Sequence, residues 1–261
     1  MRKVFFLLLL SSAFAYSAGD STFKQLTPEE LVAAVRKMTW RTHSTAAKER
    51  HNFIKCGVPV LKQLAESAPS LDADTRKQLN ELGIDTERPM AGFGRPEGLE
   101  WHYDTGIFRI HYTLKGNHAV DSTDSDSDGI PDMVELMAAT VEETYAVEIG
   151  EHGYTRPPSD RWYSDNGGSD AYDIYILDLG DLLYGFTQFE HLANLSGNNE
   201  FSEAKEEYAA TSYIVMNSNY SSFLCEEAAC VQVTFAHEFF HAIQFGYDAW
   251  DRIWFLESTA V

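Results

Sequence analysis

Two histidines and one glutamate near the carboxyl end of the chain have the types and spacing of a metal-binding pair beside a base. His237, Glu238 and His241 form an H-E-x-x-H pattern. Residues four positions apart lie on the same face of an α-helix, so both imidazoles can reach one Zn²⁺. Glu238 lies one residue further along, where its carboxylate can take a proton from a water molecule near the metal. The pattern predicts a zinc centre that can activate water.

A second helix is expected to complete this centre, because a zinc ion that keeps one position for water needs three protein ligands. The run 231–245 is apolar and lacks Gly and Pro, and Gly246 is expected to cap the helix that it forms. In the apolar run 252–261, Glu257 is the only acid, which makes it the preferred third ligand. Asp248 is the alternative, but it is one residue out of register for a ligand that follows a glycine turn.

The preceding elements predict an α+β fold with a small twisted sheet. Residues 107–114 and 171–179 alternate as strands, 213–216 are a third strand, and 132–149 carry apolar residues on one helical face. These elements can provide the sheet against which the H-E-x-x-H helix packs. The last helix is expected to pack inward through three consecutive apolar residues, Trp254, Phe255 and Leu256.

Residues 18–90 are expected to form a helical segment ahead of the sheet. A first helix is predicted to begin at Thr27, and further short helices are predicted over 59–65 and 72–82. A stretch rich in Gly and Pro follows and is expected to be a linker, so that residues 91–261 form the main domain. The helical segment is either a removable pro-region or a layer of the mature fold.

The first 17 residues have the pattern of a secretory signal peptide. Residues 1–17 combine a short basic start, an apolar run and a small-x-small cleavage site, and are too short to span a membrane. We therefore expect an exported protein with no stable membrane insertion after cleavage. In an oxidising environment, Cys225 and Cys230 are expected to form a disulfide just before the H-E-x-x-H helix. The alternatives are two free thiols, or pairing of one of them with Cys56.

An acidic loop upstream of this region has the D-x-D-x-D-G-x5-E spacing of a 12-residue calcium loop. Alternate carboxylates would surround a hard cation, and Gly129 permits the sharp turn. Pro131 replaces the residue that pairs two loops in an EF-hand, so the pattern is closer to single calcium loops of the thrombospondin or dockerin type. A solvated acidic turn is the alternative. The expected ligands are Asp124, Asp126, Asp128, the carbonyl of Ile130, Asp132 directly or through water, and Glu135.

Several stretches from about residue 92 onward, taken together and in order, resemble secreted bacterial zinc metalloproteases of the Glu-liganded, gluzincin-like kind. The resemblance implies a zincin-like domain that hydrolyses peptide bonds on zinc, with His237, His241 and Glu257 as ligands and Glu238 as base. It also implies that the chain ends inside the ligand-bearing helix, with groups that stabilise the transition state beyond Val261. The matching stretches are Ile107–Tyr112, Asp126–Asp132, Tyr172–Ile176, Ala236–Gln244 and Trp254–Ala260.

A cysteine in the helical segment has a pattern of its own. Residues 54–59 resemble the short motif with which some zymogen metalloproteases block their own zinc, although that motif belongs to a differently liganded group of enzymes. A thiolate from Cys56 in the position of the water would keep such an enzyme latent.

The sequence as a whole favours an exported zinc-dependent endopeptidase that acts on protein or peptide substrates, with Zn²⁺ as cofactor and Ca²⁺ as a structural ion. The net charge of −20 argues against nucleic acid as a partner. One alternative is a zinc aminopeptidase or another zinc hydrolase. The other is a calcium-stabilised surface binding protein with a non-catalytic zinc site, for which an intact Glu238 would not be needed.

Overall fold

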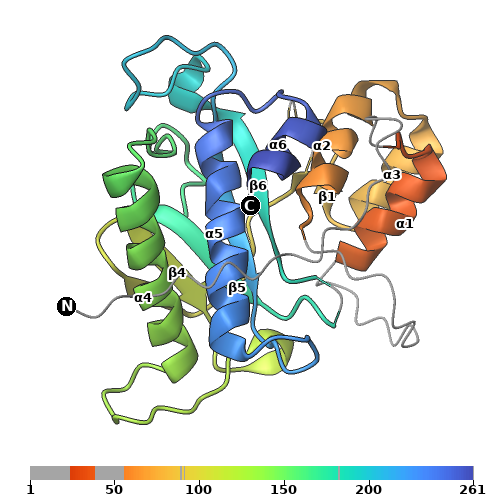
Figure 1. Ribbon diagram of the computed structural model, residues 1–261. Helices are drawn as coiled ribbons and strands as arrows, with labels where there is room; N and C mark the ends of the chain where they lie inside the picture. The colour runs from red at the N-terminus through yellow and green to blue at the C-terminus, as the bar shows by residue number, and fades with distance from the viewer. Residues whose placement is uncertain (1–23, 39–55, 89, 91, 182, 261) are drawn as a thin grey trace.

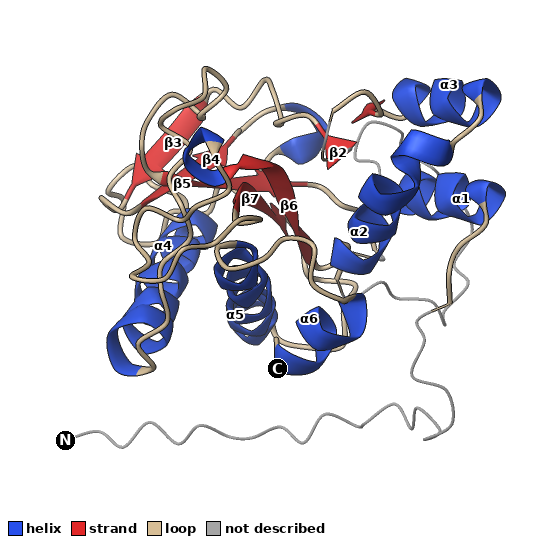
Figure 2. Cartoon of the chain, turned by 90° about the horizontal axis from the view of Figure 1, so that it is seen from above, coloured by secondary structure: helices blue, strands red, loops and turns tan. Residues whose placement is uncertain are grey.

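The computed structural model describes residues 24–38, 56–88, 90, 92–181 and 183–260 (Figure 1). The signal peptide predicted over residues 1–17 lies outside these ranges. Within them the chain is α+β, with one five-stranded sheet and helices packed against both of its faces (Figure 2). No helix in the described ranges combines the length and the apolar character that a membrane crossing requires.

The central sheet is mixed, with strand order β3-β4-β5-β7-β6. Its three inner strands are parallel, and the two edge strands are antiparallel to their neighbours. The three predicted strands correspond to the inner strands, and neither edge strand was predicted. The strands are β3 (Trp101–Asp104), β4 (Phe108–Tyr112), β5 (Tyr172–Leu177), β6 (Gly185–Leu192) and β7 (Ala210–Asn217).

Side chains of the inner strands alternate between two cores, as the two-residue period of a strand requires. Ile174 and Ile176 of β5 face the two long helices α4 (Asp132–Tyr145) and α5 (Glu227–Phe245). Tyr175, between them, belongs to the core on the other face of the sheet. Because β5 and β7 are covered on both sides, nearly all of their residues are buried. In Figure 1, α4 and α5 lie side by side in front of the sheet.

The N-terminal helices form the second core with the sheet. The predicted helices correspond to α1 (Pro28–Met38), α2 (Val58–Ser67) and α3 (Ala73–Glu81), and their apolar residues share one buried cluster with β5, β6 and β7. Two short strands, β1 (Ile84–Asp85) and β2 (Gly92–Phe93), pair with each other beside these helices. The expected linker therefore contains β2, which lies against the sheet through Gln188 of β6.

The last helix is shorter and less buried than expected. The helix α6 comprises Ile253–Thr259, and its inward face carries Leu256 and Glu257. The prediction that Trp254 and Phe255 also pack inward is wrong, because their exposed fractions are 48% and 39%. A helix of two turns presents only one stripe of residues three and four apart to its neighbour, and this stripe excludes both aromatic residues.

The remaining short helical segments lie between the main elements. The end of α4 continues as one π-helical turn, and three 3-10 turns occur in connections within the described ranges. They are η1 (Ala68–Ser70), η2 (Gly116–His118), the π turn η3 (Ala146–Glu151) and η4 (Ala193–Leu195).

The predicted disulfide between Cys225 and Cys230 is confirmed. The two Cα atoms are 5.6 Å apart, and the bridge closes the loop at the start of α5. This helix begins at Glu227, four residues before the predicted run. Cys56 is consequently the only free thiol among the three cysteines of the chain.

Candidate metal centre

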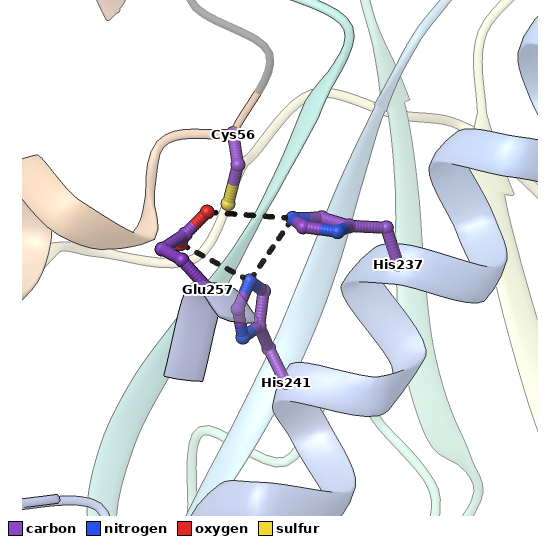
Figure 3. A group of neighbouring side chains, drawn as sticks. All are labelled: Cys56, His237, His241 and Glu257. Atoms are coloured by element: carbon purple, nitrogen blue, oxygen red, sulfur yellow. Dashed lines mark hydrogen bonds and ion pairs between the residues drawn. The ribbon is translucent and has the colours of Figure 1, made fainter. Parts of the chain in front are cut away.

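The H-E-x-x-H histidines and Glu257 meet at the contact between α5 and α6 (Figure 3). The Nε2 atoms of His237 and His241 are 3.1 Å apart. Glu257 Oε1 lies 3.4 Å from Nε2 of His241, and Glu257 Oε2 lies 3.9 Å from Nε2 of His237. The structure thus brings the three predicted zinc ligands together. Asp248, the alternative ligand, instead accepts a hydrogen bond from the backbone N–H of Trp250 and does not belong to this group.

Hydrogen bonds on the far side of each ring determine which nitrogen faces the centre. Nδ1 of His237 contacts the backbone carbonyl of Ala260, and Nδ1 of His241 lies 2.7 Å from Oε1 of Gln244. Both partners are oxygens that can only accept, so both Nδ1 atoms carry the hydrogen. In neutral rings the two Nε2 lone pairs therefore point into the centre. Two such lone pairs at 3.1 Å repel each other unless a cation lies between them, and this fits a metal site.

Gln244 also ties the two helices of the centre together. Its Nε2 donates to the carbonyl oxygen of Leu256 at 3.0 Å and to Oγ1 of Thr259 at 2.7 Å, both in α6. These two bonds fix the orientation of the amide, so that its Oε1 must face His241. One side chain therefore sets both the position of the Glu257 helix and the orientation of an imidazole.

Glu238 is fully buried next to the two histidines. Its Oε2 accepts a hydrogen bond of 2.9 Å from Oγ1 of Thr187, a residue of the edge strand β6, and the same hydroxyl lies 2.7 Å from the Glu238 backbone oxygen. Its Oε1 is buried and has no hydrogen-bond partner among the residues that the structure describes. Burial of such an atom is costly unless a polar group from outside the chain satisfies it. Thr187 thus leaves one carboxylate oxygen available for a proton.

The charges in the centre favour a bound cation. Burial alone would lower the pKa of His241, but the adjacent Glu257 and Glu238 carboxylates reverse this effect and raise it. Burial would raise the pKa of Glu257, but the two imidazoles outweigh burial and lower the pKa. The centre therefore holds one fully buried and one partly buried carboxylate against two imidazoles, and this negative, oxygen- and nitrogen-rich set of donors suits Zn²⁺.

A fourth potential ligand comes from the N-terminal segment. Sγ of Cys56 lies within 4.8 Å of ligand atoms of His237, His241 and Glu257. The same sulfur is 3.7 Å from Oε2 of Glu238. Burial, followed by the charges of Glu238 and Glu257, raises the pKa of the Cys56 thiol well above its usual value. Together the four residues form a Cys-His-His-Glu set.

The acidic loop before α4 gathers only part of its expected ligands. The carboxylates of Asp124, Asp126 and Asp128 come within 4.8 Å of one another, and the turn between them has φ angles of 64° at Ser127 and 94° at Gly129. Backbone N–H groups stabilise this arrangement, such as that of Gly129, which donates to Oδ2 of Asp124 at 2.9 Å. The loop is therefore folded around its carboxylates.

The two later acids of the loop differ in their positions. Asp132 is outside the group of three, because both of its oxygens accept hydrogen bonds from Ser125, at 2.8 Å from the backbone and 2.6 Å from the hydroxyl. Glu135 lies in the first turn of α4, and burial together with the charges of the nearby aspartates raises its pKa. Glu135 thus experiences the negative field that a calcium ion would neutralise.

The roles of two polar residues in the candidate centre were not predicted from the sequence. Gln244 follows His241 by three positions on the same helix, a spacing at which side chains touch, so its role could have been inferred. Thr187 lies in β6, fifty-one residues before Glu238. No local pattern links two residues so far apart.

Comparisons with protein-family models, with curated proteins and with solved structures find no match for this chain. The metalloprotease resemblance described for the sequence therefore remains an expectation. A functional assignment rests on the geometry of the centre between α5 and α6.

Proposed function

We propose that this protein is an exported zinc-dependent endopeptidase with a zincin-like domain. The observation that carries the proposal is the convergence of the two Nε2 atoms and the Glu257 carboxylate beside the fully buried Glu238. A zinc ion held by His237, His241 and Glu257 would polarise a scissile carbonyl and acidify a water molecule. The donor types, the outer hydrogen bonds and the unpartnered oxygen of Glu238 all fit this ion.

The residues around the ion have separate tasks in this proposal. Glu238 takes the proton of the attacking water and later passes it to the leaving amine. Thr187 holds Oε2, so that the carboxylate keeps one orientation. Ala260 and Gln244 keep the Nδ1 hydrogens of His237 and His241 away from the centre.

The arrangement of the elements supports a peptide substrate. Helix α5 packs across a mixed sheet, and the edge strand β6 passes next to Glu238 through Thr187. An extended peptide can align with an edge strand and form backbone hydrogen bonds with it. Alignment along β6, once the N-terminal segment that packs against this strand has moved away, would bring a peptide bond of the substrate near the base.

The approach of Cys56 favours one other candidate, a non-catalytic zinc site in a surface binding protein. Four protein ligands close a zinc site, and such closed sites are typical of structural zinc. Against this reading, a structural site has no need for a buried carboxylate such as Glu238 next to the ligands. The calcium loop would stabilise the fold in either case.

The two candidates are separated by casein digestion, measured in the Cys56→Ala background so that the thiol cannot block the centre. We expect Cys56→Ala to digest casein and a zinc chelator to stop the digestion. Adding Glu238→Gln should reduce the rate at least about 100-fold, because general-base catalysis contributes at least that much. Zinc content should remain unchanged, since Glu238 is not a ligand in this proposal.

Two results would contradict the proposal. Equal activity of Cys56→Ala with and without Glu238→Gln would exclude Glu238 as the base. A zinc-loaded Cys56→Ala protein that hydrolyses neither casein nor short peptides would favour the non-catalytic site.

A further inference from the structure

The thiol of Cys56 points into the candidate zinc centre from a segment outside the two helices that form it. In Figure 3 the four side chains of Cys56, His237, His241 and Glu257 point toward one another. The sulfur also contacts Oε2 of Glu238, at 3.7 Å. The thiol thus lies between the proposed ligands and the proposed base, where the attacking water would have to bind.

The backbone around Cys56 is suited to a thiolate. The N–H of Val58, the first residue of α2, donates to Sγ at 3.3 Å. The amino end of a helix carries a partial positive charge, which favours a negatively charged sulfur. Cys56 therefore has one favourable interaction for its charged form besides the metal.

The segment that carries Cys56 is packed firmly in place. A Cβ atom at Gly57 would lie 2.7 Å from Cβ of Phe186 and would also meet Met38, so only glycine fits here. Cys56 and Val58 belong to a buried apolar cluster that includes Phe189 of β6 and Leu256 of α6, one residue before Glu257. The close approach at Gly57 thus lets the thiol reach the centre.

We propose that Cys56 binds the zinc as its fourth ligand and keeps the enzyme latent. This proposal rests on the proposed zinc site. Coordination requires the thiolate, so the thiol proton is released, and Oε2 of Glu238 is placed to accept it. Latency then has two causes: the sulfur fills the position of the water, and its segment packs against the edge strand beside the centre. Activity requires Sγ to leave the centre.

Replacement of the zinc by Co²⁺ tests the coordination directly in the full chain. We expect near-ultraviolet thiolate-to-Co²⁺ charge-transfer absorption in the unaltered protein, and its loss in Cys56→Ala with the visible Co²⁺ bands retained. Cys225 and Cys230 are joined in a disulfide, so Cys56 is the sole source of a thiolate. Val58→Ala is the matched control, because it trims the same buried cluster but keeps the thiol and should keep the absorption.

Two further measurements test the consequences. Cys56→Ala should bind zinc at least about 10-fold more weakly, since even the loss of an outer partner of a ligand costs this much. It should also digest casein at least about 10-fold faster than the unaltered protein, because the fourth position on the zinc ion is then free for water.

The outcomes separate this proposal from the proposed function. Visible Co²⁺ bands without charge-transfer absorption in the unaltered protein would overturn the role of Cys56 and leave the zinc site intact. Persistence of the absorption in Cys56→Ala would also overturn it. Loss of the absorption with equal casein digestion by both proteins would support the coordination and overturn latency, whereas a zinc-loaded Cys56→Ala protein without activity would overturn the endopeptidase. Failure of Co²⁺ and Zn²⁺ to bind at all would refute the zinc site itself.

Discussion

At the scale of single residues, Gln244 links one candidate ligand to the helix that carries another. Its amide accepts from Nδ1 of His241 and donates to two oxygens of α6, so that a single side chain couples the imidazole to the Glu257 helix. Partners of this kind fix the tautomer and the orientation of a ligand. The metal affinity should therefore depend on a residue that does not touch the metal.

We predict that Gln244→Leu lowers the zinc affinity by about 10- to 100-fold, measured by competition with a chelator. The substitution leaves Nδ1 of His241 without its acceptor and removes the side-chain donor to the carbonyl of Leu256. Gln232→Leu on the exposed face of the same helix is the control and should leave the affinity unchanged. Equal affinities of the two variants would show that Gln244 does not orient the ligand.

The residues that sequence analysis identified are those with local patterns. His237, Glu238 and His241 are fixed relative to one another by the period of one helix. Glu257 could be inferred because it is the only acid on the next apolar helix. Thr187 and the approach of Cys56 to the centre depend on contacts over 51 and 182 residues, which no period encodes. Only the motif around Cys56 indicated a role for it.

At the scale of elements, the acidic loop determines how β4 connects to α4. Three aspartates share a small volume, and Glu135 faces their field from the first turn of the helix. Like charges so close together destabilise the loop unless a cation offsets them. We therefore propose that this loop binds Ca²⁺ and that the bound ion stabilises the fold.

We predict that Ca²⁺ raises the melting temperature of the protein. At a Ca²⁺ concentration 100 times the dissociation constant, binding adds about 2.7 kcal/mol to the free energy of unfolding. Asp126→Asn should reduce the shift, whereas Asp74→Asn, an exposed acid of α3, should not. A melting temperature that does not change at millimolar Ca²⁺ would rule out this site.

The elements that were predicted differ from those that were not in the apolar pattern of their sequences. The sequences of the inner strands and the long helices contain the apolar residues that are needed to bury a large face of each element. β6 was missed because Thr187, Gln188 and Glu190 interrupt its apolar pattern, although all three are buried. The partners of these side chains lie far away in the sequence. Thr187 donates a hydrogen bond to Glu238, Gln188 accepts one from the backbone of Phe93 in β2, and Glu190 accepts one from Arg95.

At the scale of the whole molecule, Arg95 ties the stretch after β2 to the sheet. Its guanidinium contacts Asp173 of β5, lies 2.6 Å from Glu190 of β6, and lies 2.5 Å from Asp160 in the loop before β5. Three buried carboxylates share this one cation, and burial raises the pKa of Asp160 to about 6. The network therefore holds the stretch after β2 against the sheet through charge.

We predict that Arg95→Met lowers the free energy of unfolding by about 3–5 kcal/mol, because it leaves buried carboxylates without their cation. Denaturant unfolding measures this change. Arg109→Met is the control: its partner Asp104 is 44% exposed, so the loss should stay below about 1 kcal/mol. Similar losses in both variants would mean that the Arg95 network contributes no more than a surface pair.

The proposed function and the proposed role of Cys56 both depend on one zinc ion between α5 and α6. Anomalous X-ray scattering at the zinc edge, from crystals of the zinc-loaded protein, locates the ion most directly. We predict one strong peak about 2.0–2.1 Å from Nε2 of both His237 and His241, with Glu257 as a further ligand. A zinc-loaded crystal with no peak there, or with its main peak at another group such as Asp165, Glu190 and His191, would contradict the proposed centre.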